Sequence, residues 1–482
     1  MFTPSRHSWL IHVLVSIAVQ PCMAQHSFKL PMGRVQRGRT NAFGNAFSSL
    51  APVSQVKELY ALNFGYSGPL SFSLSAVPIQ SISLDTGSSD LWTVSNKCTD
   101  TDCQNVRKYQ YLSSSLVPSH DPFKLNYLSG SVSGDINFET ITIGSYEVSQ
   151  QVFALANKTE NLGLSTTGNS GIMGLCFAPS ASIPPTTGNT LMDNLFSSLP
   201  EDKRYFAIKL GRDSANDSSS SLTFGEIDTD YARSIDDFAF TPVSKDGATD
   251  YNFWKIPLRS LTVDAATLDL SPSLVPGAKS PIAVLDTGTT LVLGPTIDVD
   301  AFWGMAGPSS SARKNPISGL WEVHCNRSIA TGFVLGDKGA EKEYFVHPRD
   351  LSWIDGGQAN GWCLGGIQAN DGVNSGDWLL GDTFLRNVYT IHHGATSTEP
   401  PKIGLLNLTD PSKADSEFRA ERGIESSSPL PNALPVHNRL TQAASDSITS
   451  YIASSICGFM GGAVLTTLFR ARALVMAKGR RV

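Results

Sequence analysis

The feature that most restricts the fold of this chain is a short sequence that occurs twice. Residues 84–89 read Leu-Asp-Thr-Gly-Ser-Ser, and residues 285–290 read Leu-Asp-Thr-Gly-Thr-Thr. Each follows an apolar run, which predicts a buried strand that turns at the glycine and presents one carboxylate there. Asp85 and Asp286 are 201 positions apart, so each half of the chain supplies one. We therefore expect two similar lobes whose aspartates meet.

Two carboxyl groups in contact cannot both ionise cheaply, so such a pair shares a proton. The ionised member can take a proton from water while the protonated member polarises a substrate carbonyl. Neighbouring amides and hydroxyls can donate hydrogen bonds that orient the carboxylates, and the two threonines can link the loops. The predicted supporting residues are Thr86, Gly87, Ser88, Thr287, Gly288 and Thr289. The plain alternative is two coincidental Asp-Gly turns, because such turns are common.

Four segments carry a resemblance to a known family: residues 84–92, 286–291, 170–175 and 378–385. Through them, residues 60–408 resemble the pepsin-like aspartic proteases. The resemblance implies an all-β, bilobal pepsin-like fold, with two β-rich lobes flanking a central cleft. It also places the segments 170–175 and 378–385 one behind each catalytic turn, and residues 205–210 and 221–226 among the strands between the lobes.

By the same resemblance, the chain is expected to be an aspartic endopeptidase that binds a protein or peptide substrate as an extended strand in the cleft. Asp85 and Asp286 are the expected catalytic residues. Acidic pH is the expected working range, because the body of the chain is rich in carboxylates. A monomer is expected, and neither a metal nor an organic cofactor is implied.

Residues 123–134 resemble the flap hairpin that closes over substrate in this family. Tyr127 matches the flap tyrosine that can hydrogen-bond Trp92, although an ordinary strand aromatic is the plain alternative. Leu128 departs from the family pattern, which usually has glycine there. Ser129 and Thr290 complete the expected substrate-binding set.

The charge of the chain is unevenly distributed. Residues 1–49 hold five basic and no acidic residues, whereas residues 50–410 hold 23 basic and 38 acidic ones. An acidic body is a poor binder of nucleic acid, so no nucleic-acid partner is expected. Many carboxylates would be protonated at low pH, which relieves their mutual repulsion.

The cysteines suit a secreted protein. Cys98 and Cys103 enclose four residues, a spacing typical of a small disulfide loop, and they also match a bridge position of the family. Cys325 and Cys363 stand where the family has its second-lobe bridge. Cys176 lies in an apolar run, which predicts a buried, unreactive thiol.

Two further patterns are candidates for chemistry. His392-His393 suggests a metal site, but no other ligand-spaced residue accompanies the pair, so we interpret it as a structural departure from the family. Four Asn-x-Ser/Thr sequences are candidate glycosylation sites: Asn157, Asn216, Asn326 and Asn407.

Composition and the family resemblance together divide the chain into seven parts, and the two lobes among them are what the resemblance implies. They are a signal peptide (1–24), a basic pro-segment (25–50), an N-terminal lobe with Asp85 and the flap (51–215), a C-terminal lobe with Asp286 (216–408), a Ser/Ala/Pro-rich stalk (409–447), a transmembrane helix (448–469) and a basic cytoplasmic tail (470–482). The catalytic lobes are then extracellular or lumenal, at the cell surface or in a vacuole-like compartment.

The two apolar segments leave alternatives open. The alternative to a signal peptide is an uncleaved N-terminal anchor, but the apolar run at residues 9–19 is short for a helix that spans a bilayer. Residues 448–469 contain no charge and would reach about 33 Å as a helix, enough to cross a membrane. A lipid-anchor signal would normally end the chain, and an amphipathic surface helix is the other reading.

Two rival functions compete with the endopeptidase. One is a peptide-binding protein of the same fold that has lost catalytic power, which Leu128 and the His392-His393 pair keep open. The other is a Mg²⁺-dependent phosphotransferase with an Asp-x-Thr-Gly-Thr-like loop. The secretory signal, the paired cysteines and the duplicated motif oppose the second rival.

Overall fold

The computed structural model of the chain describes residues 28–36, 64–72, 80–111, 113–127, 130–144, 146–212, 220–247, 250–307, 310–354, 361–373 and 375–424. All of them belong to the first of two compact units, residues 1–424, and the second unit comprises residues 425–482. The predicted signal peptide, transmembrane helix and cytoplasmic tail lie outside the described residues, as do Leu128, Ser129 and Asn216.

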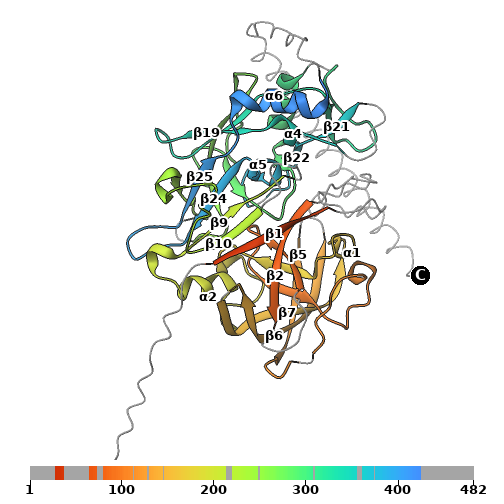
Figure 1. Ribbon diagram of the computed structural model, residues 1–482, viewed down its shortest axis with the longest axis vertical. Helices are drawn as coiled ribbons and strands as arrows, with labels where there is room; N and C mark the ends of the chain where they lie inside the picture. Colours follow the sequence, from red (N-terminus) through yellow and green to blue (C-terminus); the bar gives the residue numbers. More distant parts are fainter. Residues whose placement is uncertain are drawn as a thin grey trace, which may run out of the picture. The chain divides into compact units, whose positions relative to one another are not determined.

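Strands are the main regular structure of the described chain, and its helices are few and short (Figure 1). The largest sheet contains, in spatial order, β11 (Ala239–Pro242), β25 (Lys402–Asn407), β24 (Val388–His393), β9 (Tyr205–Lys209), β10 (Ser220–Phe224), β1 (Phe28–Gln36), β2 (Phe64–Phe72), β3 (Gln80–Asp85), β8 (Gly171–Gly174), β4 (Leu91–Val94), β7 (Tyr146–Glu160), β6 (Ser131–Ile143) and β5 (Val117–Asn126).

Two smaller sheets lie in the second half of the sequence. One contains β19 (Lys342–Val346), β18 (Thr331–Leu335), β12 (Lys255–Val263), β14 (Ile282–Leu285), β23 (Trp378–Leu380), β15 (Val292–Gly294) and β22 (Ile367–Ala369), with β13 (Ala266–Asp269) paired to β12. The other contains β16 (Ala312–Lys314), β17 (Trp321–His324), β21 (Trp362–Gly365) and β20 (Ser352–Trp353).

The described helices are short. They are α1 (Leu164–Thr167), α2 (Leu191–Ser197), α3 (Thr296–Ala306), α4 (Pro348–Leu351), α5 (Asp382–Leu385) and α6 (Pro411–Arg422), with 3₁₀ turns η1 (Thr101–Cys103), η2 (Ala178–Ser180), η3 (Glu201–Lys203) and η4 (Ile235–Asp237). No helix within the described ranges is long and apolar enough to cross a membrane.

The two halves of the chain are joined through the largest sheet and through a common core. Strand β9 of the first half pairs with β24 of the second, in a register that sets Ile208 opposite Thr390. One cluster of buried side chains includes Leu84 and Leu175 from the first half and Trp254 and Leu285 from the second. An all-β, bilobal architecture therefore describes this unit, and a single core lies beneath both Asp-Thr-Gly turns.

Part of the predicted pro-segment belongs to this architecture. Residues 28–36 form β1, which pairs with β10 along its first half and with β2 along its second half. Strand β1 thus lies between β10 and β2 inside the largest sheet.

The structure contains two disulfides within the described residues, Cys98–Cys103 and Cys325–Cys363. Cys176 is a buried free thiol whose pKa is raised by burial, so it stays protonated. Cys22 and Cys457 lie outside the described residues.

The predicted stalk boundary at residue 409 is too early. Residues 411–422 form α6. Asp410 caps its N-terminus, because the Asp410 side chain accepts a hydrogen bond from the backbone N–H of Ser412. Pro411 occupies the first helical position, where proline is favoured. Arg422 at its C-terminal end donates to the backbone oxygen of Ser352 at 2.6 Å. The Ser, Ala and Pro content of the region predicted a flexible stalk, but its first part is a helix that specific contacts hold against the second lobe.

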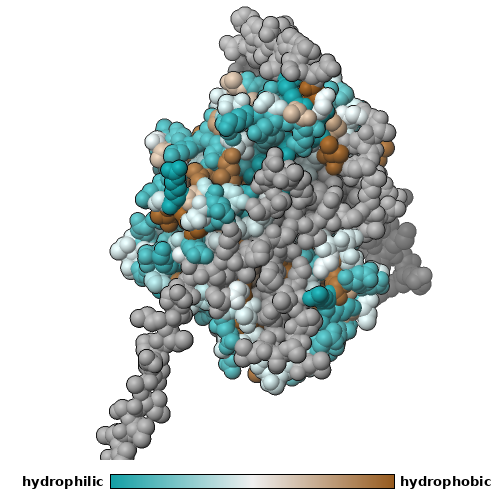
Figure 2. All heavy atoms as spheres, in the orientation of Figure 1, coloured by the Kyte–Doolittle hydropathy of each residue, from teal (hydrophilic) through white to brown (hydrophobic). Residues whose placement is uncertain are grey.

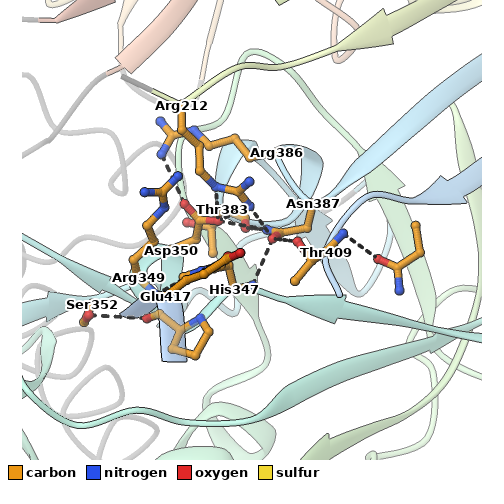
Figure 3. A network of polar contacts seen from close by, with 12 residues as sticks. Arg212, His347, Arg349, Asp350, Ser352, Thr383, Arg386, Asn387, Thr409 and Glu417 are labelled. Atoms are coloured by element: carbon orange, nitrogen blue, oxygen red, sulfur yellow. Dashed lines mark hydrogen bonds and ion pairs between the residues drawn. The ribbon is translucent and has the colours of Figure 1, made fainter. Parts of the chain in front are cut away.

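A network of polar groups, most of them buried, surrounds Asp350 (Figure 3). Arg212 donates to the Asp350 carboxylate at 2.7 Å, and Arg386 approaches it at 3.5 Å. Asn387 donates to the same carboxylate at 3.0 Å and accepts from the hydroxyl of Thr409 at 2.6 Å. Burial opposes ionisation, but the two guanidinium groups outweigh it and hold the pKa of Asp350 far below its usual value. Asp350 is therefore an anion at every physiological pH.

The network leads outward to α6. His347 accepts from the N–H of Arg349 through Nδ1, so Nε2 carries the proton and faces Glu417 of α6 at 3.4 Å. Arg349 pairs with Glu421, also on α6, at 2.7 Å. The helix is thus joined to the segment that holds Asp350 by one ion pair, Arg349–Glu421, and by the contact of the neutral His347 ring with Glu417.

We predict that Asp350→Asn lowers the free energy of unfolding by about 3–5 kcal/mol, because it leaves buried guanidinium charges without their counter-ion. Urea unfolding measures this. As a control, Asp415→Asn removes an exposed ion pair to Arg419 within α6 and should cost less than about 1 kcal/mol. Equal losses in the two variants would contradict the assignment.

Candidate active site

Both Asp-Thr-Gly sequences stand at the ends of buried strands with matching neighbours. Asp85 ends β3, which runs parallel to β8, and Asp286 follows β14, which runs parallel to β23. The N–H of Leu175 donates to the backbone oxygen of Asp85 at 2.8 Å, and the N–H of Asp286 donates to that of Leu380 at 3.1 Å. The segments expected behind the two turns therefore lie directly beside them.

The loops are bound to each other by their threonines. The N–H of Thr86 donates to the hydroxyl oxygen of Thr287 at 3.1 Å, and the N–H of Thr287 donates to that of Thr86 at 3.0 Å. Each hydroxyl in turn donates across the interface, Thr86 to Leu285 at 2.9 Å and Thr287 to Leu84 at 3.0 Å. Four hydrogen bonds therefore fix the two loops in a nearly symmetrical arrangement.

Each carboxylate receives the same pair of donors from its own loop. Gly87 N–H and the Ser88 hydroxyl donate to Asp85 at 2.8 and 2.5 Å. Gly288 N–H and the Thr289 hydroxyl donate to Asp286 at 2.8 and 2.6 Å. These donors orient the carboxylates and favour their ionised forms.

Glycine is required at both loops because the opposite carboxylate lies so close. A Cβ atom on Gly87 would stand 2.5 Å from Oδ1 of Asp286, and one on Gly288 would stand 2.5 Å from Oδ1 of Asp85. No carbon atom fits at that distance, so any side chain would force the carboxyl groups apart.

The proximity of the carboxyl groups changes their acidity. Asp85 is only 6% exposed, and burial followed by the charge of Asp286 raises its pKa from 3.8 to about 7. The donors Ser88 and Gly87 act in the opposite direction. The pair therefore retains a proton up to about neutral pH.

Tyr127 and Trp92 also meet as expected. The Trp92 indole donates to the Tyr127 hydroxyl at 2.7 Å. Tyr127 ends the described part of the β5 arm, and burial, followed by the charge of Asp85, raises the pKa of its phenol. The structure thus brings this tyrosine close to the carboxyl pair.

Thr290 connects the Asp286 loop to α5. The N–H of Thr383 in α5 donates to the Thr290 oxygen at 3.0 Å. The side chain of Asn387, a member of the Asp350 network, donates to the Thr383 oxygen at 2.9 Å. The buried ionic network therefore supports the helix that backs the Asp286 loop.

Sequence reasoning missed the residues that support the site from a distance. Trp254, on the second half of the chain, donates its indole N–H to the oxygen of Leu175 at 2.7 Å. Asp350 is likewise remote in sequence from its partners, 138 positions from Arg212 and 36 from Arg386. No local sequence pattern marks these residues, because each meets its partner only in the folded chain.

The glycosylation candidates differ in their surroundings. The Asn157 side chain is engaged, since it accepts from Ser95 at 2.7 Å and donates to Asp135 at 2.8 Å. Asn326 is exposed, and Asn407 is half-buried.

The His392-His393 pair does not converge on one point. Successive residues of a strand face opposite sides of the sheet, and both belong to β24. His392 stacks on Phe206 with ring centroids 4.6 Å apart and meets Trp254 edge-on at 5.1 Å. It is therefore an aromatic member of the core.

Comparison with known proteins gives a consistent result. The sequence profile described as eukaryotic aspartyl protease matches residues 77–404. Major aspartyl peptidase 1 of Cryptococcus neoformans is 25% identical over 359 residues, covering 72% of this chain and 69% of that protein. Endothiapepsin of Cryphonectria parasitica is 29% identical over 339 residues (68% and 73%). Pepsin A of Bos taurus is 27% identical over 311 residues (64% and 76%).

Proposed function

The chain belongs to the eukaryotic aspartyl protease family, and from that premise we propose that it is an endopeptidase whose catalytic groups are Asp85 and Asp286. The observation that carries the proposal is the contact between two buried carboxyl groups, each held by a glycine N–H and a hydroxyl of its own loop. The aspartic peptidases among its relatives support the reaction class.

The proposed reaction begins with an extended peptide lying across the pair, beneath the hairpin that carries Tyr127. The ionised carboxylate removes a proton from a water molecule, and the water oxygen attacks the peptide carbonyl carbon. The protonated carboxyl group donates its proton to the carbonyl oxygen, which gives a neutral gem-diol. Both oxygen atoms of the new centre then lie against the carboxyl pair.

The second step breaks the C–N bond. The carboxyl group that took the proton of water transfers it to the nitrogen, and one gem-diol hydroxyl returns its proton to the other carboxylate. The products are an amine and a carboxylic acid, and the pair again holds one proton. Neither a metal ion nor a covalent intermediate is needed for this balance.

The test is cleavage of a mixed peptide library by the purified chain, with Asp85→Asn and Asp286→Asn in parallel. We expect both variants to lose at least about 10³-fold in activity, because each removes one member of a unit that acts together. Cleavage should persist in EDTA, which separates this mechanism from the Mg²⁺-dependent phosphotransferase. Folded wild-type protein that cleaves nothing after removal of its pro-segment would instead favour the peptide-binding alternative.

The raised pKa of Asp85 predicts the alkaline limit of activity. Above about pH 7 the pair loses its shared proton and becomes a dianion, so kcat/KM should fall as pH rises through about 7. Ser88→Ala removes a donor that stabilises the ionised carboxylate, so the limit should move to higher pH. A pH–rate profile measures this, with Ser149→Ala, an exposed serine on β7, as the control. A shift to lower pH would contradict the assigned role of Ser88.

We propose further that the protein enters the secretory pathway, is made as a zymogen with a basic pro-segment, and is anchored by residues 448–469. The supporting pattern is the uncharged run followed by five basic residues. Full-length protein should remain with membranes after alkaline carbonate extraction, whereas a chain ending at residue 447 should be released. Release of both chains would disprove the anchor.

A further inference from the structure

The strand pair β9–β24 presents two different faces. Tyr205 lies opposite His393 in the register, and Phe206 lies opposite His392. Phe206 and His392 pack against Trp254 in the core that continues beneath the Asp-Thr-Gly turns. Because successive strand residues alternate, Tyr205 and His393 face the other side of the sheet.

On that other side the surface is hollowed. The hollow has a volume of about 760 Å³ and lies between η3, the segment after β10, and the connection between β24 and β25. Tyr205 and His393 are among its lining residues, and they are the most buried titratable ones, at 4% and 6% exposure. Their rings stack with centroids 5.8 Å apart and planes inclined by 20°.

The polar atoms of this aromatic floor are available to a ligand. His393 Nδ1 is 2.7 Å from the oxygen of Gly394, and a carbonyl can only accept, so Nδ1 carries the proton and Nε2 holds a lone pair. Burial lowers the pKa of His393, which keeps the ring neutral. Within the described residues, neither Nε2 nor the Tyr205 hydroxyl has a hydrogen-bond partner.

The walls of the hollow carry more negative than positive charge. Glu201, Asp202, Glu226 and Glu399 line it, against Lys203 and Lys402. Lys402 is already paired with Glu399 at 2.6 Å. Ile227 and Ile235 add an apolar wall on which the methylene stem of a long side chain can lie.

An acceptor on the floor, two aromatic rings, an acidic wall and an apolar wall together match one kind of ligand. An ammonium or guanidinium group can donate to Nε2 of His393, lie against the aromatic rings and be attracted by the carboxylates. We propose that this hollow is a second binding site, on the side of the sheet opposite the core beneath the carboxyl pair, that takes a lysine or arginine side chain of a peptide segment.

The site would bind a basic part of a protein without requiring that this part be cut. It is therefore independent of the proposed peptidase activity, and a failure of one would leave the other unchanged.

The experiment is calorimetric titration of the full chain carrying Asp286→Asn, so that no peptide is consumed. The probe is a tetralysine peptide with blocked termini, with its fully acetylated form as the comparison. We expect acetylation to weaken binding by at least about tenfold, since it removes the charge that the site recognises. Free 1,5-diaminopentane provides the same ammonium group without a peptide.

Variants locate the binding. Asp202→Asn combined with Glu399→Gln should weaken tetralysine binding by about tenfold, at about threefold for each exposed carboxylate. The matched control, Glu147→Gln with Asp337→Asn, removes the same charge from exposed positions outside the hollow and should change the Kd by less than about twofold. Tyr205→Phe, checked for an unchanged melting temperature, should weaken binding through loss of the hydroxyl alone.

Three results would overturn the proposal: no binding of tetralysine at millimolar concentration, equal weakening by the two double variants, or diaminopentane binding as tightly as the peptide. The second result would show general attraction to an acidic protein, and the third would show a site for free amines.

Discussion

The structure depends on the reciprocal hydrogen bonds between Thr86 and Thr287. Each threonine offers its N–H to the hydroxyl of the other, so neither loop can satisfy its own backbone without its counterpart. The carboxyl pair exists only while this contact holds. The shared sheet, in which β9 pairs with β24, and the common core beneath the loops supply the rigidity that the contact needs. The two Asp-Thr-Gly loops, one from each half of the chain, are thereby held at hydrogen-bond distance from each other.

Asp85 and Asp350 show how neighbours decide the state of a buried carboxyl group. Burial opposes ionisation of both. Asp85 faces a second carboxylate, and its pKa rises, so the group keeps its proton up to about neutral pH. Asp350 lies between Arg212 and Arg386, and its pKa falls, which keeps a permanent charge. The same residue type is therefore kept protonated up to about neutral pH in one place and permanently charged in the other.

Much of the centre of this protein could be predicted from the sequence, because its determinants are local. The Asp-Thr-Gly turns, the glycines forced by close approach and the Cys98–Cys103 loop each lie within a few residues. Helix α6 could not be predicted, because a polar, Ser- and Pro-containing segment becomes a helix here through ion pairs such as that between Arg349 and Glu421. The place of β1 in the sheet and the different faces of His392 and His393 likewise follow from strand register, which a single sequence does not display.

The burial of His392 makes the stability of the folded protein depend on pH. Burial lowers the pKa of this imidazole to about 3, and the ring has no hydrogen-bond partner among the described residues. The unfolded chain, with an ordinary imidazole, binds a proton as the pH falls below about 6.5, whereas the folded chain does not. The free energy of unfolding therefore decreases as the pH falls from about 6.5 to about 3. This core histidine therefore makes the folded state less stable in a strongly acidic medium than in a near-neutral one.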